Sequence, residues 1–124
     1  RNSSRHDVNL SSVIKKRRDD EKGIYAILTS ISTLGAAFIV RGEIGELLDF
    51  NEYSQNNKRI VIEVYASPEQ KIIFEGEMIR KTSKDKGIEY GVHIVDMDVE
   101  SEKILNDFIN QLIIKSKEYY NKQS

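Results

Sequence analysis

The chain has 124 residues, of which 39% are hydrophobic and 31% are charged, and its formal net charge is −1. This length is typical of one domain with a modest core, and the composition excludes a disordered chain. The longest apolar run, residues 34–40, is far too short to span a bilayer, so we expect no membrane insertion. The absence of cysteine excludes disulfides and thiol chemistry, and agrees with a cytoplasmic location.

The small net charge hides an uneven distribution. Residues 1–18 carry six basic groups and one acid, a charge of +5, whereas the remainder carries 13 basic and 19 acidic groups, a charge of −6. A basic segment on an acidic domain indicates an anionic partner for that segment. The acidic remainder argues against long nucleic acid, which needs an extended basic surface. A small anionic ligand fits this distribution better.

Alternating apolar residues predict six strands, at residues 8–18, 24–30, 36–40, 59–66, 70–81 and 88–96. Turn-forming residues separate most of these strands, while residues 41–58 show no decisive pattern. Strands that follow one another without helices between them are typical of an all-β fold. The pattern therefore predicts an antiparallel barrel or sandwich with one C-terminal helix. The positions expected to share an inward face include Val8, Leu10, Ser12, Ile14, Ile60, Ile62, Val64, Ile72, Phe74, Gly76 and Met78.

The pattern changes to a helical period near residue 98. Asp98 is a suitable N-cap, and acids are frequent in the turn that follows it. The apolar stripe of this helix consists of Ile104, Leu105, Phe108, Ile109 and Leu112, and we expect it to pack against the barrel. Ile113 and Ile114 widen the stripe. They indicate either a broader core-facing surface or a second contact, such as a homodimer through this helix.

Few side chains are suited to catalysis. The chain has no cysteine, and its histidines, His6 and His93, lie far apart in sequence, so we expect no metal site. None of the common nucleophile, phosphate-loop or zinc motifs occurs. Residues 96–102 begin like a calcium loop but have a serine where the glycine is needed, and helix capping explains their acids more simply. We therefore expect no enzymatic activity.

The stretch Ser30-Ile31-Ser32-Thr33-Leu34-Gly35 closes one predicted strand and opens the next. Its hydroxyl groups and exposed backbone N–H groups could hold an anion, and Gly35 would let a ligand or another backbone approach closely. Taken alone, the stretch is more simply explained as an ordinary turn in which the serines satisfy local backbone groups.

Three motifs together resemble the PilZ domain family. The first is Arg1-x-x-x-Arg5, and the second is Ser30-x-Ser32-x-x-Gly35 after one hairpin. The third is the strand at residues 90–98, which is similar to the last strand of the family. The resemblance extends from Arg1 to about Phe108. It implies an all-β fold, a six-stranded antiparallel β-barrel with one C-terminal helix, that binds the bacterial second messenger cyclic di-GMP.

The resemblance also implies residue roles. Arg1 and Arg5 would contact phosphates and guanine edges, Ser32 would hydrogen-bond the ligand, and Gly35 would permit its close approach. Ser30 is part of this expected site, but it stands where the family usually has Asp or Asn. A serine hydroxyl is a shorter, single-point acceptor, so this departure predicts weakened binding.

We therefore expect one domain over residues 1–124, excised from a longer protein because the chain starts at Arg1 without a methionine. Residues 1–7 would clamp the ligand, residues 8–97 would form the barrel, and residues 98–122 the helix. The module would act as a cyclic di-GMP receptor and pass the signal to a neighbouring domain or protein partner in flagellar, pilus or polysaccharide machinery, with motility and biofilm as outputs. One alternative is a degenerate PilZ-like interaction module that does not bind the nucleotide. A barrel for single-stranded nucleic acid is a weaker alternative, because Tyr25 is the sole aromatic residue near the basic groups in sequence.

Overall fold

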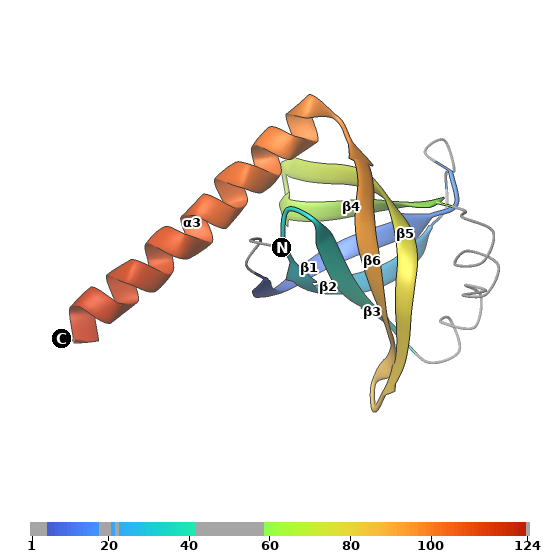
Figure 1. The fold of residues 1–124 in the computed structure, drawn as a ribbon, viewed down its shortest axis with the longest axis horizontal. Coiled ribbons are helices and arrows are strands. Elements are labelled where there is room, and N and C mark those ends of the chain that lie inside the picture. The colour runs from blue at the N-terminus through green and yellow to red at the C-terminus, as the bar shows by residue number, and fades with distance from the viewer. Residues whose placement is uncertain (1–4, 18–20, 22, 42–58, 124) are drawn as a thin grey trace.

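The computed structural model describes residues 5–17, 21, 23–41 and 59–123, which form a closed antiparallel barrel followed by a long helix (Figure 1). The elements are β1 (His6–Lys15), β2 (Ile24–Ile31), β3 (Gly35–Val40), β4 (Arg59–Ser67), β5 (Gln70–Lys84), β6 (Gly87–Met97) and α3 (Val99–Gln123). The strand order around the barrel is β1-β2-β3-β6-β5-β4, and β1 pairs with β4 to close it. The predicted all-β class, antiparallel barrel and C-terminal helix are confirmed.

Some predicted boundaries differ from the observed ones. The first strand begins at His6 rather than residue 8, so it takes in two residues of the expected clamp segment, and it ends at Lys15 rather than residue 18. The undecided segment lies almost wholly outside the described residues, at positions 42–58. The turn before β6 ends at Gly87, whose φ of 152° disfavours a residue with a side chain.

The core fills the barrel interior. The two largest aromatic side chains in it, Phe38 and Tyr90, are fully buried and stack with ring centroids 5.5 Å apart. Burial raises the pKa of the Tyr90 hydroxyl. The period-two alternation accounts for this core, because successive side chains of a strand point to opposite faces. The predicted inward positions are buried at Ser12, Ile14, Ile60, Ile62, Val64, Ile72, Phe74, Gly76 and Met78, and partly buried at Val8 and Leu10.

Strand β4 is buried on its outer face as well as its inner one. Val61 and Glu63, which alternate with the inward residues, are 4% and 7% exposed. The Glu63 carboxylate lies 2.9 Å from Lys15 Nζ and 3.3 Å from Lys71 Nζ, so one acid joins three neighbouring strands. Burial opposes the charged form of Glu63, but hydrogen bonds from the two lysines outweigh it and lower its pKa.

The start of α3 is tied to the barrel by two hydrogen bonds. The Asp98 carboxylate accepts the Ser101 backbone N–H at 2.8 Å, which confirms Asp98 as the N-cap. The buried Ser101 hydroxyl in turn accepts the Ile73 N–H of β5 at 3.0 Å. The first turn of the helix is thereby held against one strand.

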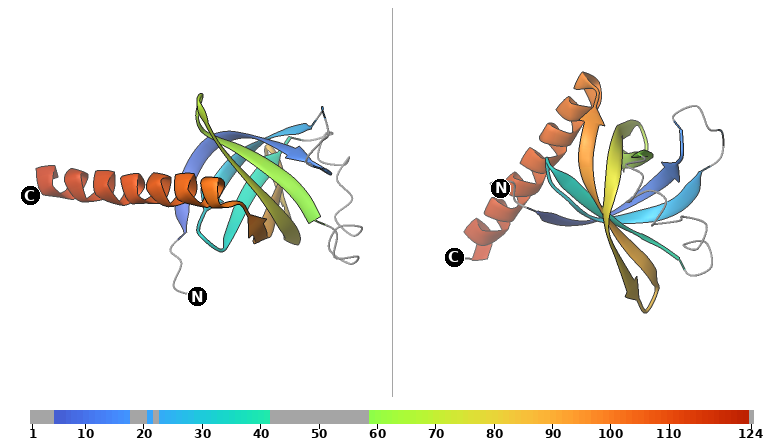
Figure 2. Two further views of the ribbon diagram at one scale, coloured as in Figure 1. Left: turned by 90° about the horizontal axis from the view of Figure 1, so that it is seen from above. Right: turned by 45° about the vertical axis from the view of Figure 1, so that its right-hand side comes forward.

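The apolar stripe of α3 packs on the barrel for part of its length. Leu105 is buried in the core cluster, and Ile104, Phe108 and Ile109 pack against it. Beyond these residues the helix runs clear of the barrel, as Figures 1 and 2 show. Four of the five residues of the predicted stripe thus belong to the core cluster or pack against it, and Leu112 is the exception. A homodimer through this helix stays a prediction.

No helix in the described part of the chain is long and apolar enough to cross a membrane.

Candidate functional site

Three of the predicted site residues meet at one hollow in the barrel surface. Arg5 immediately precedes β1, Ser32 lies in the connection between β2 and β3, and Gly35 is the first residue of β3. The antiparallel register pairs His6 with Ile31, and this places Arg5 beside Ser32. Together with residues of β5 and β6, these three residues line a hollow of about 300 Å³, called here the Arg5 hollow.

The Ser32 hydroxyl organises the turn beside this hollow. Ser32 Oγ accepts the backbone N–H groups of Leu34 and Gly35 at 3.2 and 3.1 Å. The Ser32 N–H donates to the Gly35 carbonyl at 2.9 Å. The interpretation that these N–H groups are exposed to cradle an anion is therefore wrong for Ser32, Leu34 and Gly35, because each already has a partner within the turn. The Ser32 hydroxyl instead accepts hydrogen bonds from the backbone of its own turn, as the alternative interpretation of this stretch predicted.

Gly35 allows close approach, and the group that approaches it is a backbone carbonyl. A Cβ at this position would lie 2.9 Å from the carbonyl oxygen of Val92 on β6. Glycine at a strand position commonly marks such contacts. Gly35 thus fixes the spacing of β3 and β6 at the edge of the hollow, and its lack of a side chain also keeps that edge open.

The other two predicted residues are placed differently. Ser30 is buried, with 6% of its surface exposed, and it does not belong to the described lining of the Arg5 hollow. Arg1 lies outside the described residues. Ligand contacts by Ser30 and Arg1 therefore stay predictions from the family motif.

The hollow also includes residues that sequence reasoning missed. Ile79 and Arg80 of β5 and His93 of β6 line it. The sequence did contain a signal for Arg80. The inward alternation of Gly76 and Met78, if continued, would place Arg80 in the barrel interior, where an arginine is unfavourable. The structure resolves this conflict with a register shift between Met78 and Arg80.

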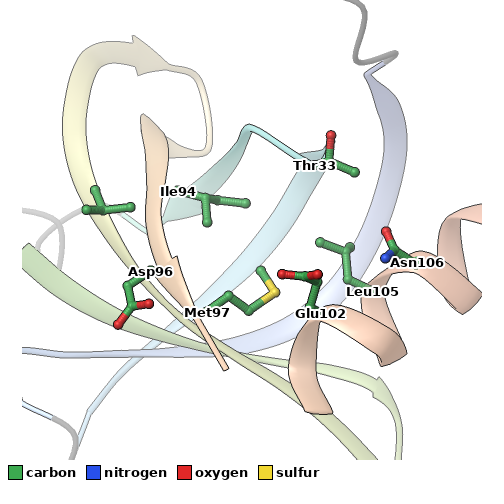
Figure 3. A pocket seen from close by; sticks show the side chains of 8 residues that line it. Thr33, Ile94, Asp96, Met97, Glu102, Leu105 and Asn106 are labelled. Carbon is green, nitrogen blue, oxygen red and sulfur yellow. The ribbon is translucent and has the colours of Figure 1, made fainter. Parts of the chain in front are cut away.

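The charge of the Arg5 hollow distinguishes it from two other described hollows. Its described lining contains two arginines and a histidine, without any acid. A hollow of about 410 Å³ lies between β6, the β2–β3 turn and α3 (Figure 3). The described residues that line it include the acids Asp96 and Glu102 but no basic side chain. A third, of about 640 Å³ beside the start of α3, carries four acids and two lysines. The Arg5 hollow is thus the described one best suited to an anion.

Two groups with displaced pKa values, Glu63 and Tyr90, lie away from the Arg5 hollow. Within the described residues, no group of three or more His, Asp or Glu side chains is placed to hold a metal ion. The Arg5 hollow itself offers guanidinium, imidazole and apolar groups. Such groups can bind an anion or a base by hydrogen bonding and stacking.

The described part of the chain thus combines a six-stranded antiparallel barrel with a basic hollow beside its β2–β3 turn. The chain belongs to the PilZ domain family, whose profile matches residues 1–111. The predicted family membership is confirmed. No curated protein matches the chain significantly.

Solved structures of low sequence identity share the fold. The chain superposes on YcgR of Escherichia coli in complex with c-di-GMP with a TM-score of 0.71 and 16% identity, covering 100% of this chain and 50% of that one. For the c-di-GMP-bound PilZ domain of YcgR alone, the TM-score is 0.67 at 16% identity, with 98% of each chain covered. For the inhibitor of motility MotI/DgrA of Bacillus subtilis, it is 0.68 at 17% identity, covering 93% of this chain and 52% of that one. The chain thus spans about half the length of full YcgR and of MotI.

Proposed function

We propose that this module is a receptor for cyclic di-GMP that binds the nucleotide in the Arg5 hollow. The observation that carries the proposal is the meeting of Arg5, Ser32 and Gly35 at a hollow whose described lining is basic and free of acids. The module belongs to the PilZ family, and two of the solved structures that it resembles hold c-di-GMP. PilZ domains are receptor or effector domains, so we expect ligand binding without catalysis.

Arg5 has the chemistry that this ligand requires. A guanidinium group can pair through two parallel hydrogen bonds with a phosphate or with the O6/N7 edge of guanine. It can also stack on a base. Arg5 is exposed and directly precedes β1, so a bound dianion would draw the segment around it toward the barrel mouth. This change of position would pass the signal to a neighbouring domain or a protein partner.

Ser30 weakens the proposed site rather than abolishing it. A guanine donor that loses its acceptor on binding costs roughly 1–3 kcal/mol, which is about a tenfold to hundredfold loss of affinity. A bridging water would recover part of that loss. We therefore expect an affinity below that of a site with Asp or Asn at this position.

The biological setting is also part of the proposal. We place the module in the cytoplasm of a bacterium, where its ligand would be a second messenger. Its output would reach a neighbouring domain or a protein partner in motility or biofilm machinery. MotI, whose fold this chain resembles, is an inhibitor of motility, and this supports motility as the first output to examine.

Calorimetric titration with cyclic di-GMP tests the proposal. The wild-type chain should bind, and Arg5→Ala should weaken binding at least about tenfold, as expected for the loss of a charged hydrogen-bonding partner. Lys16→Ala is the matched control, because Lys16 is also an exposed cation beside β1 but lies beyond its other end. Absence of both binding heat and a shift in melting temperature at high micromolar ligand would contradict the proposal.

The alternative is a PilZ-like interaction module that does not bind the nucleotide. The burial of Ser30 away from the described wall of the hollow favours it. Ser30→Asp separates the two functions. In a receptor it should tighten cyclic di-GMP binding while destabilising the ligand-free protein, since it buries a carboxylate. In a pure interaction module it should leave nucleotide binding absent.

A further inference from the structure

A β-bulge in β5 brings two consecutive side chains to the same hollow. Met78 pairs with Val92 and Arg80 pairs with Gly91, so Ile79 is an extra residue opposite β6. Met78 stays in the core at 3% exposure, whereas Ile79 is 65% exposed, and both Ile79 and Arg80 line the Arg5 hollow. Bulges often lie beside functional sites, where they redirect a side chain. This one turns an arginine from the core-facing phase to the surface.

The guanidinium group of Arg80 lies across the backbone of β6. Its Cζ and Nη2 atoms are each 3.1 Å from the point that a Cβ on Gly91 would occupy. The absence of a side chain at Gly91 therefore creates the place that the guanidinium occupies. The guanidinium group thus packs over Gly91, which itself lines the Arg5 hollow.

Glu89 restrains Arg80 without neutralising it fully. Arg80 Nη2 lies 4.0 Å from Glu89 Oε1, a long separation for an ion pair, and the Arg80 side chain is still 43% exposed. Glu89 is itself held in place, because the Thr29 hydroxyl donates to its other carboxylate oxygen at 3.1 Å. Arg80 is thus oriented and still accessible to a ligand.

We propose that Ile79 and Arg80 form a second wall of the nucleotide site, opposite the edge that Arg5 and Ser32 provide. Arg80 stacks on or pairs bidentately with a guanine, and Ile79 covers the apolar face of the same base. This inference rests on the proposed function and deepens it, because it assigns recognition of the base to β5, outside the family motifs found in the sequence.

The test compares Arg80→Ala with Lys84→Ala by calorimetric titration with cyclic di-GMP. Lys84 is the matched control because it also pairs with Glu89 Oε1, at 3.9 Å, and is 49% exposed, yet it is not part of the described lining of the hollow. Arg80→Ala should raise the Kd about tenfold to a hundredfold, as expected for a hydrogen-bonding charged partner, and Lys84→Ala should change it less than about twofold.

Two further variants separate a planar contact from simple charge attraction. Arg80→Lys keeps the charge but lacks the planar fork, so it should lose nearly as much affinity as Arg80→Ala. Ile79→Ser should also weaken binding, whereas Ile79→Leu should largely preserve it. Far-ultraviolet circular dichroism and melting temperature of each variant establish that it is folded.

The outcomes distinguish this inference from the proposed function. If the wild-type chain binds and Arg5→Ala weakens binding, but Arg80→Ala behaves like Lys84→Ala, the second wall is wrong and the receptor function stands. Full retention of affinity in Arg80→Lys would overturn the planar contact. If the wild-type chain does not bind cyclic di-GMP, both proposals fail.

Discussion

Gly35 and Val92 are in such close contact that the backbone of β6 occupies the space a side chain on β3 would need. A Cβ at Gly35 would lie 2.9 Å from the Val92 carbonyl oxygen. The same two residues line the Arg5 hollow. The packing of two paired strands and the shape of the proposed ligand site therefore depend on one glycine.

Gly35→Ala should lower the free energy of unfolding by about 1–3 kcal/mol, because the added methyl group must displace backbone atoms. Urea denaturation measures this change. Gly91→Ala is a suitable comparison, since its added Cβ would meet chiefly the far end of the long Arg80 side chain, at 3.1 Å, rather than a backbone atom. We expect Gly91→Ala to lower the free energy of unfolding less than Gly35→Ala does. Equal losses in the two variants would show that the Val92 carbonyl is not the determining contact.

Ser32→Ala should loosen the β2–β3 turn, because the Ser32 hydroxyl accepts two backbone N–H groups. We expect a destabilisation of about 1 kcal/mol, the usual net value of such hydrogen bonds. The specific readout is amide hydrogen exchange at Gly35, which should accelerate in Ser32→Ala and stay slow in Ser32→Thr. Unchanged exchange at Gly35 in Ser32→Ala would mean that the hydroxyl does not hold the turn.

Glu63 should make stability depend on pH. Its pKa in the folded protein is lowered, so its contribution is present above the unfolded-state value of about 4.3. That contribution is lost as the pH falls through the lower folded-state pKa. Glu63→Gln should therefore cost about 1–3 kcal/mol at pH 7, where a charged hydrogen-bonding partner is lost, and much less in strong acid.

Urea denaturation of the wild type and of Glu63→Gln across acidic and neutral pH measures this dependence. Glu69→Gln serves as the control, because Glu69 is an exposed acid in the turn before β5. A difference between wild type and Glu63→Gln that persists unchanged in acid would contradict the role assigned to the charge.

Asp98→Ala should weaken the junction between β6 and α3. It removes the acceptor of the Ser101 N–H, and loss of an N-cap costs about 0.5–2 kcal/mol. Asp98→Asn should be milder, because an amide oxygen can also cap a helix. The change is measured as the free energy of unfolding. Equal stability of the wild type and Asp98→Ala would show that the bond from Ser101 to β5 is sufficient for the junction.

Alternation along the chain was enough to predict the strands, whereas the choice of a barrel over a sandwich came from the resemblance to the PilZ family. Ile60, Ile62 and Val64 are buried as expected, because side chains two apart share one face of a strand. The burial of Val61 and Glu63 was not predictable in this way. It depends on what packs against the outer face of β4 and on lysines from two other strands. A period-two pattern shows which residues share a face of one strand, but it shows neither what covers that face nor which side chains of other strands reach it.

The candidate site was predictable in part. Arg5, Ser32 and Gly35 were found from their motif, and the register between β1 and β2 brings them together. The sequence left the use of the turn N–H groups undecided, because a serine in a turn can bond either a ligand or its own backbone. Arg80 was missed because of the bulge in β5. Its extra residue, Ile79, places every later residue of the strand on the face opposite to the one that simple alternation predicts.

The most direct test of the central claim is a nuclear magnetic resonance titration that follows backbone amide shifts while cyclic di-GMP is added. A ligand in the Arg5 hollow should move the signals of Gly35, Gly91 and His93, which line it, and should leave the hollow at Asp96 and Glu102 little changed. Shifts confined to that acidic hollow, or no shifts at saturating ligand, would contradict the account.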